Sequence, residues 1–297
     1  MRRRNITIMV TAVALLALAG CGSSSKSSSG GSGSSTTTSA AKTRPHVTIE
    51  AKDFAYTLPA SMPSGWVDVT LHNSGKTGHQ IAFSKLGTVS FAAFKAAAIN
   101  TDVKKLSDVQ FVGGPNNADP GGSVTATIHL EPGTYGVACY IPADSDGKTH
   151  AAHGMIGQVT VTQSPDSVED APPVEGGTIT LSEFAFQTDA SFTGTGTVAI
   201  KNVGTQVHEA VIVKEAAGAT LDKVKGFFLA PPGTPPPAGP PPFTSAGGIV
   251  GLGPNQTMYQ TMALTPGKYV MICFFPDPTK GDQPHALEGM VKEITVS

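Results

Sequence analysis

Two stretches of the chain decide its fold: residues 130–142 read LEPGTYGVACYIP, and residues 264–276 read LTPGKYVMICFFP. Both contain a Pro-Gly turn, a Tyr two residues after the Gly, a Cys four residues later and a closing Pro. A second pair lies upstream, where residues 52–56 read KDFAY and residues 182–186 read SEFAF. The pairs keep their order at offsets of 134 and 130 residues, so we interpret the chain as an internal duplication.

Alternation of hydrophobic and polar residues predicts that each copy consists mainly of β-strands. Residues 66–72 and 123–130 show this alternation most clearly, as expected for strands with one buried face and one solvated face. The 34 Gly and 23 Pro of the chain supply frequent turns, which favours an all-β protein of short strands. Residues 89–100 and their counterpart at 219–230 have the spacing of a short helix.

The positions of the repeats predict the domain boundaries. We expect a first domain at residues 46–162, a linker rich in Pro and acidic residues at 163–176, and a second domain at 177–297. The 20 Lys and Arg residues are balanced by 22 Asp and Glu, which excludes nucleic acid as an expected partner. The sequence contains no Gly-x-Ser-x-Gly element and no phosphate-binding glycine loop, so we do not expect an enzyme.

Residues 1–20 have the pattern of a secretory signal peptide, with three Arg residues before an apolar run that is short for a membrane span. The segment Leu18-Ala19-Gly20-Cys21 resembles the bacterial lipobox, which implies that Cys21 is lipidated. Residues 21–45 are rich in Ser, Gly and Thr and predict a flexible tether. We therefore expect an exported protein that Cys21 anchors to the outer face of the bacterial cytoplasmic membrane, at the cell surface or in the periplasm.

Four residues that can bind copper recur in the same order in both copies. The candidate ligands are His79, Cys139, His150 and Met155 in the first copy, and His208, Cys273, His285 and Met290 in the second. Two imidazoles, one thiolate and a weak axial thioether form the donor set of copper electron-transfer sites, whose geometry changes little between the two oxidation states. Strand parity predicts that both thiols point inward.

Other interpretations of these residues remain open at the level of sequence. A buried Cys can be a small core residue, and a lone Met often only fills space. A disulfide between Cys139 and Cys273 is conceivable in an oxidising compartment, although inward-facing residues of separate cores are badly placed for it. His153 could replace His150 as a ligand, but the second copy has Glu288 at that position. Retention of all four ligand types in order, twice, favours the metal.

On these motifs, both halves resemble cupredoxins of the plastocyanin/azurin type. The resemblance rests on Gly-x-Tyr-x-x-x-Cys-x-x-Pro, on the His-x-x-x-Gly-Met element and on the strands that follow it, at 156–162 and 291–296. It implies two tandem cupredoxin-like Greek-key β-sandwiches, each with one short helix and one type 1 copper held by the ligand sets above. In this family the second His ligand usually reaches the surface within an apolar patch, through which electrons pass.

The chain departs from this family in the loops between the Cys and the second His. These loops enclose ten and eleven residues, whereas the family usually has two to four. The entropy of loop closure rises only slowly with length, so the longer loops do not exclude a metal site. We expect a membrane-anchored carrier of single electrons with a redox protein as its partner. A metal-free cupredoxin fold that serves as a surface binding or structural module, and copper sequestration at the envelope, are the alternatives.

Overall fold

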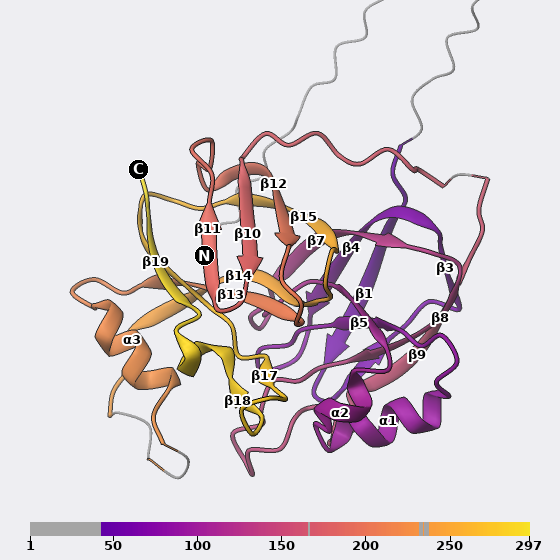
Figure 1. The fold of residues 1–297 in the computed structure, drawn as a ribbon, viewed down its shortest axis with the longest axis horizontal. Coiled ribbons are helices and arrows are strands. Elements are labelled where there is room, and N and C mark those ends of the chain that lie inside the picture. The colour runs from indigo at the N-terminus through magenta and orange to yellow at the C-terminus, as the bar shows by residue number, and fades with distance from the viewer. Residues whose placement is uncertain (1–42, 166, 232–233, 235–237) are drawn as a thin grey trace, which may run out of the picture. The chain divides into compact units, whose positions relative to one another are not determined.

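Short β-strands and few helices make up the protein, in a computed structural model that describes residues 43–297 except 166, 232–233 and 235–237 (Figure 1). We call residues 46–162 the first repeat and residues 177–297 the second repeat. The strands of the first repeat are β1 (His46–Lys52), β2 (Ala55–Thr57), β3 (Ser61–Pro63), β4 (Gly65–Asn73), β5 (Ala82–Lys85), β6 (Gln110–Gly113), β7 (Ser123–Leu130), β8 (Gly133–Ala138) and β9 (Ile156–Thr162).

The second repeat has a similar series of strands. They are β10 (Thr178–Ser182), β11 (Ala185–Thr188), β12 (Thr195–Asn202), β13 (His208–Glu215), β14 (Phe243–Leu252), β15 (Thr257–Ala263), β16 (Gly267–Ile272), β17 (Pro276–Asp277), β18 (Gln283–Pro284) and β19 (Val291–Val296). Burial alternates along β4 from Val67 to Asn73, as the sequence pattern predicts, whereas in β7 the polar Thr127 is buried together with Ala126 and Ile128. The prediction of a protein built mainly from short β-strands is therefore confirmed.

The helices predicted in each repeat are present. They are α1 (Phe91–Ile99) and α3 (Leu221–Phe228), and Ser90 and Thr220 cap their first turns with side-chain oxygens. The first repeat adds α2 (Val103–Leu106), and the second adds a 3-10 turn, η1 (His285–Glu288). Phe94 of α1 packs against β8 at Gly136, where a Cβ would lie only 2.3 Å from the ring. The absence of a side chain at this glycine thus permits the close approach of α1 to the sheet.

Two large sheets run through both repeats. One has eight strands in the order β11-β10-β12-β15-β7-β4-β1-β2, and the other has nine in the order β19-β16-β13-β14-β6-β5-β8-β9-β3. The repeats meet antiparallel in both sheets, where β15 pairs with β7 and β14 pairs with β6. Because each repeat covers an edge of the other, fewer strands are left with unpaired backbone groups.

Hydrogen bonds from the β6–β7 connection strengthen this junction. The side-chain amide of Asn116 donates to the Ile249 carbonyl at 3.1 Å, and that of Asn117 donates to Ser245 Oγ at 2.8 Å. The backbone N–H of Val250 also donates to the carbonyl of Gly114 at 3.2 Å. Hydrophobic periodicity predicts strands but does not specify which edges pair, so the continuity of the sheets across the repeats is a finding of the structure.

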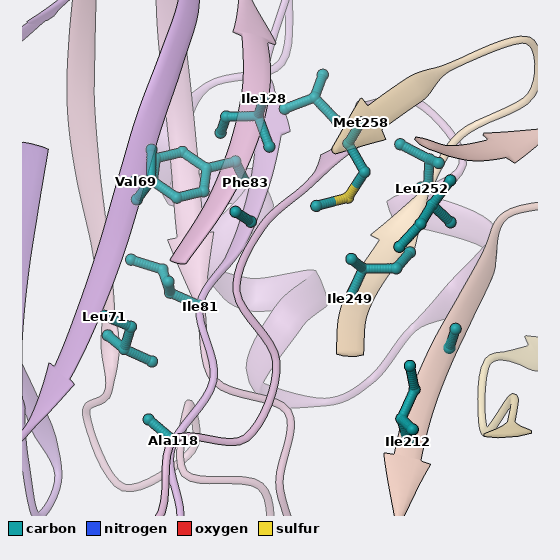
Figure 2. Packing of buried hydrophobic residues seen from close by; sticks show 14 of the residues in the cluster. Val69, Leu71, Ile81, Phe83, Ala118, Ile128, Ile212, Ile249, Leu252 and Met258 are labelled. Atoms are coloured by element: carbon teal, nitrogen blue, oxygen red, sulfur yellow. The ribbon is translucent and has the colours of Figure 1, made fainter. Parts of the chain in front are cut away.

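The main core lies between the two sheets and extends across the junction. Figure 2 shows Val69 and Ile128 of one sheet packed close to Phe83 of the other, and the same cluster continues through Leu252 and Met258 of the second repeat. All five side chains are buried. The metal-ligand candidates Cys139 and Cys273 belong to this cluster too, so the core holds them in place.

An equivalent buried Asn fixes the loop before the first His of each repeat. The side chain of Asn73 donates to the carbonyls of Thr77 and Ala118, both at 2.7 Å, and accepts from the Gly75 N–H at 2.8 Å. In the second repeat Asn202 makes the same three bonds, to Gln206, Leu252 and Gly204. The Asn-x-Gly-x-x-x-His motif is therefore a hydrogen-bonded loop that positions the imidazole of its His in the core.

Some predictions fall outside what the structure describes. The signal peptide, Cys21 and nearly all of the tether at residues 21–45 precede residue 43 and stay predictions, as do the domain boundaries. Among the described residues, no helix has both the length and the apolar character needed to cross a membrane.

We predict that Asn73→Ala lowers the free energy of unfolding by about 2–4 kcal/mol, because it removes the three hydrogen bonds that the buried Asn73 side chain makes to the backbone. Urea unfolding of the wild type and of the Asn73→Ala variant measures the effect. The control is Asn100→Ala, which removes one exposed bond to the Ala96 carbonyl and costs no more than about 1 kcal/mol. Equal stabilities of the two variants would contradict the role of the Asn73 loop.

Candidate metal centre

Two imidazoles and one thiol meet at a single point in the first repeat. His79 Nδ1 lies 3.1 Å from His150 Nδ1, and His150 Nδ1 lies 3.4 Å from Cys139 Sγ. The three donor atoms all lie within 4.8 Å of one another, which is the spacing expected of ligands that share one ion. None of the three side chains is more than 1% exposed. We call this group the first triad.

The second repeat reproduces this arrangement. His208 Nδ1 lies 3.1 Å from His285 Nδ1, and His285 Nδ1 lies 3.4 Å from Cys273 Sγ. These donor atoms again lie within 4.8 Å of one another, and all three side chains have an exposed fraction of 0%. We call this group the second triad. The six His and Cys residues that the sequence singled out are thus brought together in two equivalent groups.

Backbone hydrogen bonds hold the predicted Met of each repeat next to its triad. The Cys139 N–H donates to the Met155 carbonyl at 3.1 Å, and the Met155 N–H donates to the His150 carbonyl at 2.9 Å. The corresponding bonds of Cys273, Met290 and His285 measure 3.2 and 3.0 Å. Both Met side chains are fully buried. The His-x-x-x-Gly-Met element is therefore a turn held by backbone hydrogen bonds. It places the Met beside the Cys, which directly follows the preceding strand.

A carboxylate fixes the tautomer of the first imidazole in the first triad. Asp53 Oδ1 lies 2.8 Å from His79 Nε2 and accepts hydrogen bonds from the Lys76 N–H and the Thr77 side chain. Burial raises the pKa of Asp53, but these hydrogen bonds outweigh it and lower the pKa below the ordinary value. Because the carboxylate accepts the Nε2 proton, the lone pair of His79 Nδ1 points into the triad.

The second repeat uses Glu183 at the corresponding place, with a longer contact. Its Oε1 lies 3.5 Å from His208 Nε2 and accepts from the backbone N–H groups of Thr205 and Gln206. Burial opposes the carboxylate form, yet these bonds lower the pKa of Glu183 to about 2. The side-chain oxygen of Gln206 also lies 3.0 Å from His285 Nε2. In the second triad, therefore, a polar side-chain oxygen lies near the Nε2 atom of each imidazole.

The two Nδ1 atoms of each triad lie within hydrogen-bond distance of each other. At 3.1 Å, one neutral imidazole can carry its proton on Nδ1 and donate it to the other, or both nitrogens can turn their lone pairs toward a metal ion beside them. The thiol sulfur, 3.4 Å from one of these nitrogens, adds a third donor on the same side. Such a convergence of two imidazoles and a soft sulfur is suited to binding a transition-metal ion.

All three donors of each triad are neutral in the absence of a metal. Burial raises the pKa of the Cys139 thiol to about 11 and raises that of Cys273 further, with help from the nearby Glu209 carboxylate. Burial, together with the neighbouring imidazole, lowers the pKa of His150 and of His285 to about 4. A metal ion must therefore displace one thiol proton as it binds, which makes its affinity depend on pH.

The family resemblance led us to expect the second His of each repeat at the surface, and the structure corrects this. His150 is 1% exposed and His285 is fully buried. The ring of Phe54 covers His150 with a centroid distance of 4.6 Å, and Phe184 covers His285 at 5.0 Å. Each Phe lies in the turn between the first two strands of its repeat, which brings it over the imidazole.

The other residues raised by the sequence lie as follows. Cys139 and Cys273 are free thiols, so no disulfide joins them. His153 stands outside the first triad, where its Nε2 pairs with Asp146 at 3.0 Å. Pro142 bridges to Thr149 within the first Cys-to-His loop, while β17 pairs with β18 within the second. The long loops are thus small hairpins that return the chain to the second His.

Sequence reasoning missed the carboxylates and the Phe rings behind the imidazoles. The signal was present, since the KDFAY and SEFAF stretches recur and each contains one acid followed by Phe. In the sequence alone, this recurrence indicates duplication and does not indicate a contact with the imidazoles. Gln206 has no such signal, because the first repeat has Thr77 at the corresponding position.

Comparisons with known proteins give the following results. No known family model matches the chain, and no curated protein matches it significantly. Similar solved structures include auracyanin B, at 21% identity over 40% of this chain and 88% of that one, with a TM-score of 0.29. Reduced auracyanin from Roseiflexus castenholzii has 25% identity over 39% and 96%, with a TM-score of 0.29. Auracyanin A, a "blue" copper protein from Chloroflexus aurantiacus, has 19% identity over 39% and 99%, with a TM-score of 0.28.

We predict that the metal-free protein loses stability as the pH falls from 6.5 toward 4. The pKa values of His150 and His285 are about 4 in the folded chain and about 6.5 when unfolded, so the unfolded chain binds more protons in this range. Each imidazole then contributes on the order of 3 kcal/mol, which is present above pH 6.5 and lost on acidification.

Denaturant unfolding between pH 4 and pH 7.5 measures this loss of stability. The double variant His150→Gln/His285→Gln should flatten most of this pH dependence. A wild-type unfolding free energy that stays constant from pH 7 to pH 4 would contradict the burial of neutral imidazoles.

Proposed function

We propose that the protein carries single electrons on two type 1 copper ions, one in each repeat. His79, Cys139 and His150 hold the first ion with Met155 as a weak fourth ligand, and His208, Cys273, His285 and Met290 hold the second. The observation that carries the proposal is the pair of buried triads, in which two imidazole nitrogens 3.1 Å apart lie beside a thiol. When bound, copper supplies a one-electron redox couple.

The donor set fits copper better than the other common metals. One thiolate, two imidazoles and a neighbouring thioether make up a mixed soft and borderline set, whereas Ca²⁺ and Mg²⁺ require oxygen ligands. Structural zinc sites usually take four strong ligands, and the fourth candidate in each repeat is only a thioether. Full burial of each triad leaves no room for a substrate beside the metal, so we propose electron carriage and not catalysis.

The remaining parts of the proposal concern the whole chain. We propose two tandem Greek-key sandwiches at residues 46–162 and 177–297, joined by the linker at 163–176. The signal peptide at residues 1–20 directs export, and lipidated Cys21 with the tether at 21–45 holds the folded part at the outer face of the cytoplasmic membrane. A second redox protein is the proposed partner. The alternation of the strands and the lipobox-like Leu-Ala-Gly-Cys segment support these assignments.

Copper storage at the cell envelope is a second candidate function. The burial of both second imidazoles favours it, because no candidate ligand reaches the surface, where a redox partner would make contact. Cyclic voltammetry of the copper-loaded protein separates the two functions. A reversible one-electron couple with fast exchange supports carriage, whereas bound copper without such a couple supports storage.

We predict that the soluble protein from residue 45 onward binds two Cu(II) ions and acquires an intense visible thiolate-to-copper band. Cys139→Ser removes about half of that band, Cys273→Ser removes the other half, and the double variant removes all of it, because each thiolate serves one ion. Copper titration followed by absorption spectroscopy measures both quantities. A colourless protein with no bound copper would end the proposal.

We predict that Asp53→Asn weakens copper binding at the first triad by about 10–100-fold, because the amide no longer fixes the His79 tautomer. The measurement is a competition titration in the Cys273→Ser background, where only the first triad binds. The control is Asp146→Asn, which alters an acid paired with His153 outside the triad. Equal affinities of the two variants would remove Asp53 from the site.

A further inference from the structure

One residue beside the first triad has no polar counterpart beside the second. Tyr56 of β2 and Phe186 of β11 occupy the same place in the recurring KDFAY and SEFAF stretches. Both rings pack in the main core. The two repeats therefore differ at this position by a single hydroxyl group, and neither the ligands nor the groups that contact the imidazoles include it.

The Tyr56 hydroxyl lies at the sulfur of the first triad. It is buried within hydrogen-bond reach of Cys139 Sγ, and it donates to the carbonyl of Gln80, the residue that follows the first His. The backbone N–H groups of Gln80 and Ile141 also contact the sulfur. A phenol keeps its proton at neutral pH, so the hydroxyl is a third donor beside these two N–H groups.

The sulfur of the second triad has only the backbone donors at the corresponding positions. The N–H of Glu209 lies 3.4 Å from Cys273 Sγ, and the N–H of Phe275 contacts the same atom. Phe186 is buried at the place of the tyrosine and offers only ring carbons. The two sulfurs thus share two backbone donors and differ in one side-chain donor.

The Tyr56 hydroxyl can change its acceptor when a metal ion binds. In the metal-free chain Cys139 is a neutral thiol, and the Gln80 carbonyl accepts the hydroxyl proton. A metal ion displaces the thiol proton and leaves a thiolate. A charge-assisted hydrogen bond is about twice as strong as a neutral one, and a hydroxyl hydrogen rotates to suit the stronger acceptor. We therefore expect the O–H bond to turn toward the sulfur.

We propose that the Tyr56 hydroxyl donates to the copper-bound thiolate of Cys139 and gives the first site the higher reduction potential. This inference rests on the proposed two-copper function. Cu(II) withdraws more electron density from the sulfur than Cu(I) does, so the hydrogen bond is stronger in the reduced state and favours it. The first electron taken up converts Cu(II) to Cu(I) at the first triad. The second copper stays Cu(II), and Tyr56 keeps its proton.

The carboxylates that contact the first imidazoles do not reverse this order. Asp53 contacts its imidazole at 2.8 Å and Glu183 at 3.5 Å, which favours Cu(II) somewhat more at the first site. A carboxylate is nevertheless present at both sites and acts through an imidazole ring. The Tyr56 hydroxyl is present at one site only and acts on the sulfur itself, where hydrogen bonds tune the potential directly.

Potentiometric titration followed by the visible thiolate-to-copper band tests the proposal. Cys273→Ser isolates the first site and Cys139→Ser the second, and the first should have the higher potential. Adding Tyr56→Phe to the first background should lower the Cu(I)-to-Cu(II) ratio at a given potential about tenfold, which is a shift of about 59 mV for one electron. Adding Phe186→Tyr to the second background should raise its potential, because the new hydroxyl lies beside Cys273.

A hydroxyl away from both triads provides the matched control. Tyr259→Phe changes a ring of β15 that packs against Trp66, and it should leave both potentials as they are. The copper–sulfur stretching frequency, measured by resonance Raman spectroscopy, should change in Tyr56→Phe and not in Tyr259→Phe. Tyr56→Phe is expected to fold, since Phe already occupies this place in the second repeat.

The outcomes separate this inference from the two-copper function. A potential that Tyr56→Phe leaves unchanged overturns the inference, and so does a first site whose potential is lower than that of the second. In both cases the visible band still shows that copper is bound through the thiolates. Absence of the band from both sites overturns the two-copper function, and this inference fails with it.

Discussion

The rest of the structure depends on holding two imidazole nitrogens face to face in a dry core. At 3.1 Å, the Nδ1 atoms of His79 and His150 are within hydrogen-bond distance, and the same holds for His208 and His285. Without a metal, one neutral imidazole of each pair can donate the proton on its Nδ1 to the other, whereas metal binding requires both nitrogens to turn free lone pairs toward the ion. Water takes no part in either arrangement, because the side chains are buried. The fold must therefore supply the rigidity that keeps the two nitrogens together.

Several features of each repeat serve this constraint. The buried Asn of the preceding loop positions the first imidazole, and a carboxylate behind it orients the ring. Backbone bonds among the Cys, the second His and the Met hold the other donors together. Two sheets that continue through both repeats join these parts to a single core, so the ligands of one triad cannot move far without disturbing the packing.

The two triads are equivalent in their donors and different in their surroundings. Asp53 contacts its imidazole at 2.8 Å, whereas Glu183 lies 3.5 Å from His208. The backbone N–H that follows the first His contacts the Cys sulfur in both repeats, but that residue is Gln80 in the first repeat and the buried acid Glu209 in the second. Groups behind the ligands tune a metal site, so two copper ions bound here would differ in potential, and an electron would have a preferred site.

The sequence predicts which His and Cys residues come together, because duplication acts as an internal comparison. Any residue kept twice, such as Cys139 and Cys273, stands out against neighbours that changed. The pairing of β14 with β6 and of β15 with β7 could not be predicted, because the alternation in a strand gives its buried face and not its neighbour. The exposure of His150 was also misjudged, because Phe54 lies almost a hundred residues away in the chain and only the fold brings it over the ring.

X-ray absorption spectroscopy of the copper-loaded protein tests the central claim most directly, because it counts the atoms bound to the metal. We predict that the average copper ion has one short bond to a thiolate sulfur and two bonds to imidazole nitrogens, at two ions per chain. In Cys139→Ser, the number of bound copper ions and the number of copper–sulfur bonds should both fall from two to one per chain. Copper surrounded only by nitrogen and oxygen, with no sulfur at bonding distance, would contradict the account.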